Sequence, residues 1–266
     1  MSALRQRVGA AVRAFRQGAP AVADAPVIDP VADNFGYNSQ LWSGYSLQWD
    51  DPEFRAQNAE GSLDPDSYEV LGEEWGEIAD VEALIADWLT PHLTKDSVVA
   101  EIGSGGGRVA RRVAPQVQRL YCFDNAPDML KRLTSALADQ SAIVPVLLTE
   151  PRLPADLTAS LDVIYAFDVF VHFDLHLLWK YAQEMARCLK PGGLAFFHTS
   201  NLTAPEGWAR FAAQDHFRVE GHYFVSPDIV RTLVSRAGLD LVRESQVDES
   251  NVYLARDYLC LARKPA

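Results

Sequence analysis

The sequence has few cysteines, no long apolar run and no excess of basic residues. Cys122, Cys188 and Cys260 are the only three cysteines among 266 residues, and each falls within an apolar segment. An odd number without metal-ligand spacing argues against a disulfide framework or a zinc site, and indicates reduced core thiols in a cytoplasmic protein. No run approaches the roughly 20 apolar residues that a membrane-spanning helix needs, so we expect no stable membrane insertion.

Acidic residues outnumber basic ones. The chain has 36 Asp and Glu against 24 Lys and Arg, which gives a formal net charge of -12. Nucleic-acid-binding surfaces are basic, so we expect no nucleic-acid partner. Between residues 50 and 101 Arg55 and Lys95 are the only basic residues. We interpret this acidic region as solvated surface, or else as a field that attracts a cationic substrate.

Residues 3–17 predict an amphipathic helix. Leu4, Val8, Val12 and Phe15 fall on one helical face, with arginines beside it. The pattern is also typical of transit peptides and of membrane-surface helices. We favour a cap helix, or one that packs on a second subunit in a homo-oligomer. Residues 18–30, rich in Ala, Pro and Val, predict a linker.

The rest of the chain alternates between apolar strands and helices. Strands are expected near 97–102, 119–123, 143–148, 161–168, 193–199, 239–246 and 252–263, and helices at 77–89, 106–114, 127–139, 174–189 and 226–237. This alternation predicts an α/β, Rossmann-like fold with a seven-stranded, mostly parallel sheet and helices on both faces. We expect an N-terminal helical and aromatic cap over 1–90, a core over 91–266, and a lid insertion at 201–225.

The most informative segment is the glycine cluster that follows the first predicted strand. It comprises Glu101, Ile102, Gly103, Ser104, Gly105, Gly106 and Gly107. Glycines let the backbone approach a ligand closely, and the N–H groups of the following helix point to the same place. The dinucleotide fingerprint requires a different glycine spacing. An acid ahead of the glycines suits a cofactor with an ammonium group and no phosphates, as S-adenosylmethionine has.

Further motifs follow in order. Asp124 ends the second predicted strand about twenty residues after the glycines, where an acid can accept ribose hydroxyls. Asn125 and Met129 follow it, the fourth strand ends at Asp168, and a Leu-Lys-Pro-Gly-Gly turn at 189–193 leads into the fifth. Together these residues, over about 97–262, resemble the class I S-adenosylmethionine-dependent methyltransferases.

The resemblance implies S-adenosylmethionine as the cofactor and assigns residues to its parts. Glu101 is expected at the ammonium group, and Asp124 at the ribose. The acid that commonly follows the third strand is replaced by Thr149, so a hydroxyl or a backbone oxygen there, or else Glu150, would meet the adenine. The full set of expected cofactor-binding residues is Glu101, Gly103, Ser104, Gly105, Asp124, Asn125, Met129, Thr149, Phe167 and Asp168.

The acceptor side is predicted from histidines and aromatic residues. His172 follows the fourth strand, beneath the expected position of the methyl group, and has the intrinsic pKa of a general base. We expect it either to act as that base or to shape its loop. His198, His216 and His222 fit no standard metal-ligand spacing, so no metal is expected. The acceptor pocket is expected to involve Trp42, Tyr45, His172, Trp208, His222 and Tyr223, unless these residues only pack the cap and the lid.

These observations predict a cytoplasmic methyltransferase that uses S-adenosylmethionine. The favoured acceptor is a small molecule, modified at a hydroxyl oxygen. The alternatives are N- or C-methylation of a small molecule, methylation of a peptide or protein side chain, and a non-catalytic S-adenosylmethionine-binding module.

Overall fold

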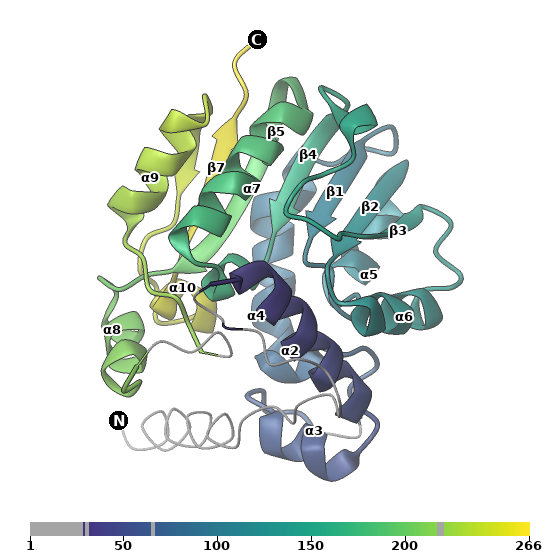
Figure 1. Ribbon diagram of the computed structural model, residues 1–266, viewed down its shortest axis with the longest axis vertical. Helices are drawn as coiled ribbons and strands as arrows, with labels where there is room; N and C mark the ends of the chain where they lie inside the picture. Colours follow the sequence, from purple (N-terminus) through teal and green to yellow (C-terminus); the bar gives the residue numbers. More distant parts are fainter. Residues whose placement is uncertain (1–28, 30–31, 65–66, 217–220) are drawn as a thin grey trace.

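The computed structural model describes residue 29 and residues 32–64, 67–216 and 221–266 (Figure 1). The helix predicted at 3–17 and nearly all of the predicted linker at 18–30 lie outside these residues. Their roles therefore stay predictions, as does the division into a cap and a core at residue 90.

A seven-stranded sheet forms the centre of the part of the chain that the structure describes. The strands are β1 (Val98–Ile102), β2 (Arg119–Asp124), β3 (Ile143–Leu147), β4 (Leu161–Ala166), β5 (Leu189–Ser200), β6 (Asp240–Glu244) and β7 (Asp257–Arg263). Their order is β3-β2-β1-β4-β5-β7-β6. Strands β1 to β5 run parallel, and β7 is antiparallel to β5 and β6. The predicted Rossmann-like, mostly parallel sheet is confirmed.

Helices cover both faces of this sheet. Helices α7 (Leu175–Cys188) and α9 (Pro227–Arg236) lie in front of it in Figure 1. The opposite face is covered by α4 (Ile78–Leu84) with its π-helical extension Ile85–Leu89, and by α5 (Ala110–Val113). Helix α6 (Pro127–Ala136) follows β2.

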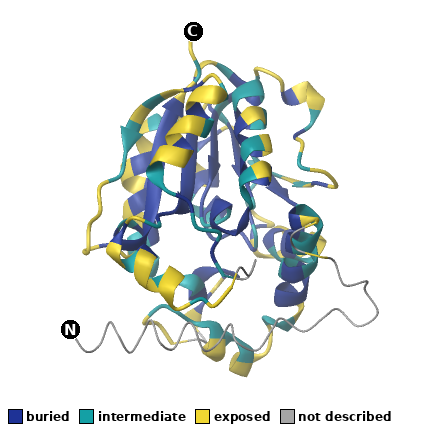
Figure 2. Ribbon diagram, turned by 60° about the vertical axis from the view of Figure 1, so that its left-hand side comes forward, coloured by how far each residue is buried: buried dark blue, intermediate teal, exposed yellow. Residues whose placement is uncertain are grey.

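Side chains of alternate strand residues divide between two apolar cores. Ala100 and Ile102 of β1 contact the core under α7 and α9, whereas Val99 contacts the one under α4 and α5. This is the period of two that a strand imposes. Figure 2 shows the result, with buried strands between helices whose outer surfaces are exposed. The sheet is therefore a rigid frame whose strand ends can position a site.

Segments outside this frame gather near the carboxyl ends of the strands. They are α2 (Asn34–Gln48), α3 (Pro52–Asn58), the short 3-10 helix η2 (Glu73–Trp75), α8 (Pro205–Ala212) and α10 (Val252–Arg256). Helix α8 lies within the predicted lid insertion. Helix α10 corrects the predicted strand 252–263, which begins only at Asp257. The side chain of Asn251 caps this helix by accepting hydrogen bonds from the backbone N–H groups of Tyr253 and Leu254.

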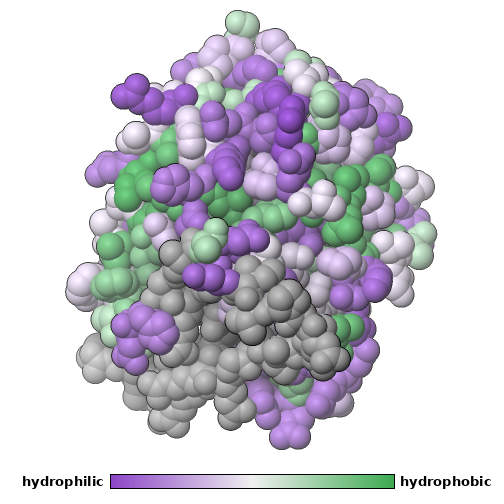
Figure 3. Space-filling view, in the orientation of Figure 1, coloured by the Kyte–Doolittle hydropathy of each residue, from purple (hydrophilic) through white to green (hydrophobic). Residues whose placement is uncertain are grey.

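The structure also bears on the expectations about cysteines, membrane-spanning helices and metal sites. All three cysteines are buried free thiols, as predicted. Among the described residues no helix is long and apolar enough to cross a membrane, and no group of three or more His, Cys, Asp or Glu side chains could hold a metal ion. The face in Figure 3 mixes hydrophilic and hydrophobic side chains outside its grey region.

Candidate functional site

A cavity of about 760 Å³, open space at its mouth included, lies at the carboxyl ends of β1, β2 and β4. The strand order reverses between β1 and β4, which is where open α/β sheets bind their ligands. Most of the wall comes from four segments: α2 with η2, the glycine turn, the end of β2 with α6, and the segment after β4. Leu148 after β3 and Tyr181 of α7 complete it. The lining residues include Asn38, Trp42, Leu71, Trp75, Glu101, Gly103, Ser104, Gly105, Arg108, Asp124, Asn125, Met129, Leu148, Phe167, Asp168, Val169 and His172.

The glycine turn packs tightly against two neighbours. The N–H groups of Gly103 and Ser104 donate to the carbonyl of Phe123, with N···O distances of 2.7 and 3.0 Å. Gly103 has φ +69°, and a Cβ built there would lie 2.4 Å from Cγ2 of Val169. Valine is stiff at χ1 and cannot turn its methyl groups away easily. Position 103 therefore requires glycine for its backbone and for its packing.

Gly103→Ala is expected to destabilise the fold more than Gly192→Ala. Gly192 has φ +82° but open space where a Cβ would stand. Its replacement should cost only the backbone strain, about 1–2 kcal/mol. Gly103→Ala adds overpacking against Val169, about 1–3 kcal/mol more. Denaturant unfolding of both variants measures the difference, and equal losses would contradict the packing argument.

Asp124 is a buried carboxylate at the end of β2. Its Oδ2 accepts from the N–H of Gly105 and its Oδ1 from the N–H of Ala126, both at 2.8 Å. Burial raises the pKa of this carboxyl to about 6, although the backbone hydrogen bonds counteract the rise. Each oxygen of a carboxylate can accept a second hydrogen bond. The side chain thus fixes the glycine turn and presents two acceptors at the cavity wall.

Glu101 is the second acid of the cavity, and one of its oxygens is unsatisfied. It lies on β1 between Cys122 of β2 and Tyr165 of β4 in the strand register. Its Oε2 is buried and makes no hydrogen bond within the described residues. Burial raises the pKa of Glu101 well above its ordinary value. The Tyr165 hydroxyl counteracts this rise in pKa. A buried oxygen that accepts no hydrogen bond is unfavourable, so a cationic ligand group beside Oε2 would be favoured.

The segment after β4 adds an ion pair and a strained residue. Asp168 has φ +60°, which is uncommon for a residue with a side chain. Its Oδ2 lies 3.0 Å from Nη2 of Arg108, and both side chains are largely buried. Burial alone would raise the pKa of Asp168. The positive charges nearby, of which the Arg108 guanidinium has the largest effect, outweigh burial and lower the pKa to about 2. Arg108 also donates to the carbonyl of Gly72 and lies over the ring of Phe167.

His172 closes the same segment with a defined tautomer. Its Nδ1 lies 2.9 Å from the carbonyl oxygen of Gly221. A carbonyl only accepts, so Nδ1 carries a proton, and in a neutral ring the lone pair would then be on Nε2. The imidazole packs edge-on against Trp42, with ring centroids 4.9 Å apart, and against His222 at 6.1 Å.

Most of the predicted site residues line this one cavity. All predicted cofactor residues except Thr149 do so, together with Trp42 and His172. The side chain of Thr149 is exposed, and Leu148 lines the cavity instead. The sequence interpretation missed Arg108 and Asn38, and noted Trp75 only for its place in the chain. Of these residues only Arg108 had a local signal in the sequence that could have marked it as part of the site, because it directly follows the glycine cluster.

Four predicted acceptor residues lie outside the lining. Tyr45 is buried behind it, accepts from Nε1 of Trp75 and donates to Glu74. His222 is buried beside His172, while the N–H of Tyr223 donates to the carbonyl of Val171. Trp208 on α8 is 56% exposed.

Comparison with known proteins agrees with this geometry. Residues 100–197 match the family model of a methyltransferase domain. No curated protein sequence matches the chain. The N-methyltransferase NodS of Bradyrhizobium japonicum WM9, solved in complex with S-adenosyl-L-homocysteine, is 18% identical, with a TM-score of 0.53, over 71% of this chain and 86% of that chain.

Two further solved structures share the fold. The YcgJ protein of Bacillus subtilis is 15% identical, with a TM-score of 0.55, over 71% of this chain and 99% of its own. The cyclase SpnF is 15% identical, with a TM-score of 0.58, over 71% of this chain and 81% of its own. At these identities the likeness shows the fold alone.

Proposed function

We propose that this chain is an S-adenosylmethionine-dependent methyltransferase of class I and that it methylates a hydroxyl oxygen of a small molecule. The observation that carries the choice of oxygen is the tautomer of His172. Its Nδ1 donates to the carbonyl of Gly221, so in the neutral ring Nε2 would be the nitrogen that accepts a proton, and the residue lines the cavity. A hydroxyl acceptor loses a proton during transfer, and a base within reach favours that step.

The lining residues fit the cofactor. The unsatisfied Oε2 of Glu101 suits the ammonium group, the glycine turn admits the methionine backbone, and Asp124 suits the ribose hydroxyls. Asn125 and Met129 would flank the adenine, with Leu148 in place of the expected Thr149. When bound, S-adenosylmethionine supplies an activated methyl group for in-line displacement. The protein must then align the acceptor and exclude water.

We assign the acceptor to the side of the cavity formed by α2 and the segment after β4. Trp42 and His172 lie there in edge contact, with Trp75 next to Trp42. Flat rings of this kind suit a small organic molecule. Tyr45 and His222 would support this wall from behind. Helix α2, within the proposed cap at 1–90, packs on α6 through Ser39 and Ser46, whose hydroxyls donate to the carbonyls of Asn125 and Asp128.

Trp208 and Tyr223 belong to the proposed lid at 201–225. If this lid closes on a bound acceptor, Trp208 would move from its exposed position toward the cavity. Three buried free thiols support a reducing, cytoplasmic location. The acidic net charge supports a small-molecule partner over a nucleic acid.

Release of S-adenosylhomocysteine tests the function. We expect the protein, supplied with S-adenosylmethionine, to produce it with phenols or alcohols and to place the methyl group on oxygen. Product analysis by mass spectrometry identifies the methylated atom. Methylation of amines alone would favour the second candidate, N-methylation, to which the acidic segment 50–101 and the likeness to NodS also point. Cofactor binding without turnover across both panels would favour a non-catalytic module.

A further inference from the structure

Asp168 needs support for its backbone conformation. Its φ of +60° is sparsely populated by residues with a side chain, and such a conformation persists only where its surroundings hold it. The neighbours of Asp168 are both part of the cavity wall: Phe167 precedes it, and Val169 follows and contacts Gly103. Whatever fixes this turn therefore also fixes one wall of the cofactor cavity.

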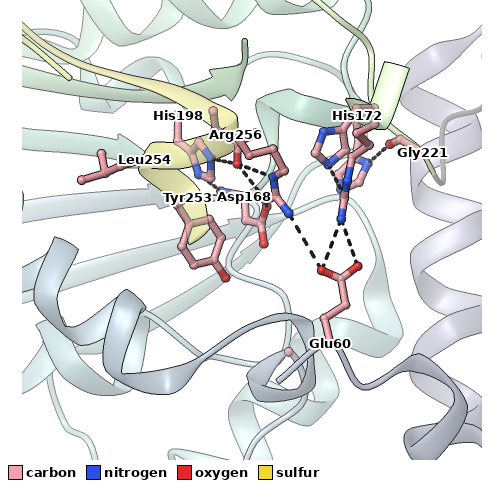
Figure 4. A network of polar contacts seen from close by, with 12 residues as sticks. Glu60, Asp168, His172, His198, Gly221, Tyr253, Leu254 and Arg256 are labelled. Atoms are coloured by element: carbon pink, nitrogen blue, oxygen red, sulfur yellow. Dashed lines mark hydrogen bonds and ion pairs between the residues drawn. The ribbon is translucent and has the colours of Figure 1, made fainter. Parts of the chain in front are cut away.

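His198 supplies that support from behind the site. It lies on β5, is fully buried, and its Nδ1 accepts the backbone N–H of Asp168 at 2.9 Å. Its Nε2 lies 3.0 Å from Oδ2 of Asp257. Figure 4 shows His198 beside Asp168 and Arg256. A backbone N–H can only donate, so Nδ1 must hold a lone pair. Nε2 must then carry the proton and donate it to the carboxylate.

Asp257 holds this tautomer because it is itself fixed. Nε and Nη2 of Arg256 lie 2.8 and 2.7 Å from its Oδ2, the same oxygen that accepts from His198. Burial alone would raise the pKa of Asp257, but Arg256 and His198 lower it, so the carboxyl is ionised. Arg256 ends α10 and also approaches Asp168, at 3.9 Å from its Oδ1.

We propose that His198 and Asp257 are positioning residues that hold the turn at Asp168 and thereby shape the S-adenosylmethionine cavity. Neither side chain lines the cavity within the described residues, so they act through the backbone N–H of Asp168. The proposal rests on the cofactor site assigned above. It extends the site by a buried imidazole at the carboxyl end of β5 and a buried acid at the start of β7, at the same edge of the sheet as Asp168. It also gives the helix–strand junction at Arg256 and Asp257 a role.

Two substitutions at position 198 separate positioning from general packing. His198→Asn keeps an oxygen acceptor near the place of Nδ1, whereas His198→Leu fills space without an acceptor. We expect the dissociation constant for S-adenosylmethionine, measured by calorimetry, to rise about tenfold or more in His198→Leu and to stay within about threefold in His198→Asn. His176→Leu is the matched control, because His176 is exposed on α7.

Unchanged affinity in His198→Leu would overturn the proposal, and so would equal weakening in both variants. If His198→Leu does not fold, the proposal is tested instead by the tautomer of His198 in the wild-type protein. The imidazole nitrogen chemical shifts, assigned by difference from His198→Asn, should show a neutral ring protonated at Nε2. A ring protonated at Nδ1 would refute the arrangement. Failure of the wild-type protein to bind the cofactor would instead refute the assigned cofactor site.

Discussion

Asp124→Ala is expected to weaken S-adenosylmethionine binding about 100-fold. The substitution removes the two carboxylate acceptors proposed for the ribose hydroxyls, and hydrogen bonds to charged groups contribute about 1.5–3 kcal/mol each. It also frees the N–H groups of Gly105 and Ala126, which Asp124 now holds at 2.8 Å. At the lower end of that range the two bonds sum to about 3 kcal/mol, which corresponds to a change in the dissociation constant of about 100-fold or slightly more.

Calorimetric titration with S-adenosylmethionine and S-adenosylhomocysteine measures this effect. Asp128→Ala is the matched control, because it removes an acid from the first turn of α6 that pairs with Lys131 and does not line the cavity. The control should bind both ligands with affinity close to that of the wild type. Equal weakening in the two variants would point to damage of α6 rather than to a ribose contact.

The same carboxyl makes cofactor binding depend on pH. Because burial raises the pKa of Asp124 from 3.8 to about 6, the folded protein takes up this proton before the unfolded chain does. From this residue alone the cofactor-free protein gains stability as the pH falls from about 6 toward 4. Cofactor affinity moves the other way, since a protonated carboxyl loses acceptor capacity. If only the ionised form binds, the dissociation constant should rise about fourfold between pH 7.5 and 5.5.

Asp124→Asn tests the origin of this pH dependence. The amide cannot titrate, so its weaker binding should lose the part of the dependence that comes from position 124. Any dependence that remains would come from other groups, above all Glu101, whose pKa burial also raises. An unchanged profile in Asp124→Asn would exclude Asp124 as its source.

Local patterns, together with the family resemblance, sufficed to predict the sheet and the residues that converge in the cavity at the ends of its strands. Apolar runs bounded by helices at ordinary spacing fixed the strand positions, and each motif follows the end of its own strand. Parallel strands bring their carboxyl ends to one edge, so Glu101, Gly103, Asp124 and Asp168 had to converge there. For these residues, the place of each at the end of a parallel strand is enough to predict that they lie close together in the fold.

Other parts of the site depend on contacts between distant segments, which single-sequence patterns do not contain. Trp75 reaches the cavity because the loop before α4 folds over the glycine turn, where Leu71 meets Gly106. Residues 252–256 were predicted as strand from their apolar character, but the cap at Asn251 starts a helix there. The link between His198 and Asp168 joins residues 30 positions apart on different strand ends.

His172→Ala is expected to lower methyl transfer to a hydroxyl acceptor by about 10²–10⁴-fold, the usual contribution of a general base. Cofactor affinity should stay within about threefold, since the assigned cofactor contacts lie on Glu101, Asp124 and the glycine turn. Part of the rate should return at high pH, where the acceptor loses its proton without a base. Initial rates of S-adenosylhomocysteine release, with the cofactor dissociation constant measured in parallel, check all three outcomes.

Two further variants distinguish a general base from a structural role for His172. His176→Ala removes an exposed histidine four residues later and should leave the rate unchanged. His172→Gln keeps a polar side chain that can donate to Gly221 but cannot accept a proton at neutral pH, so under the base hypothesis it should be as slow as His172→Ala. Restored activity in His172→Gln would instead assign His172 to shaping the segment after β4. Full activity in both His172 variants would show that transfer needs no base there, as for an amine that arrives unprotonated.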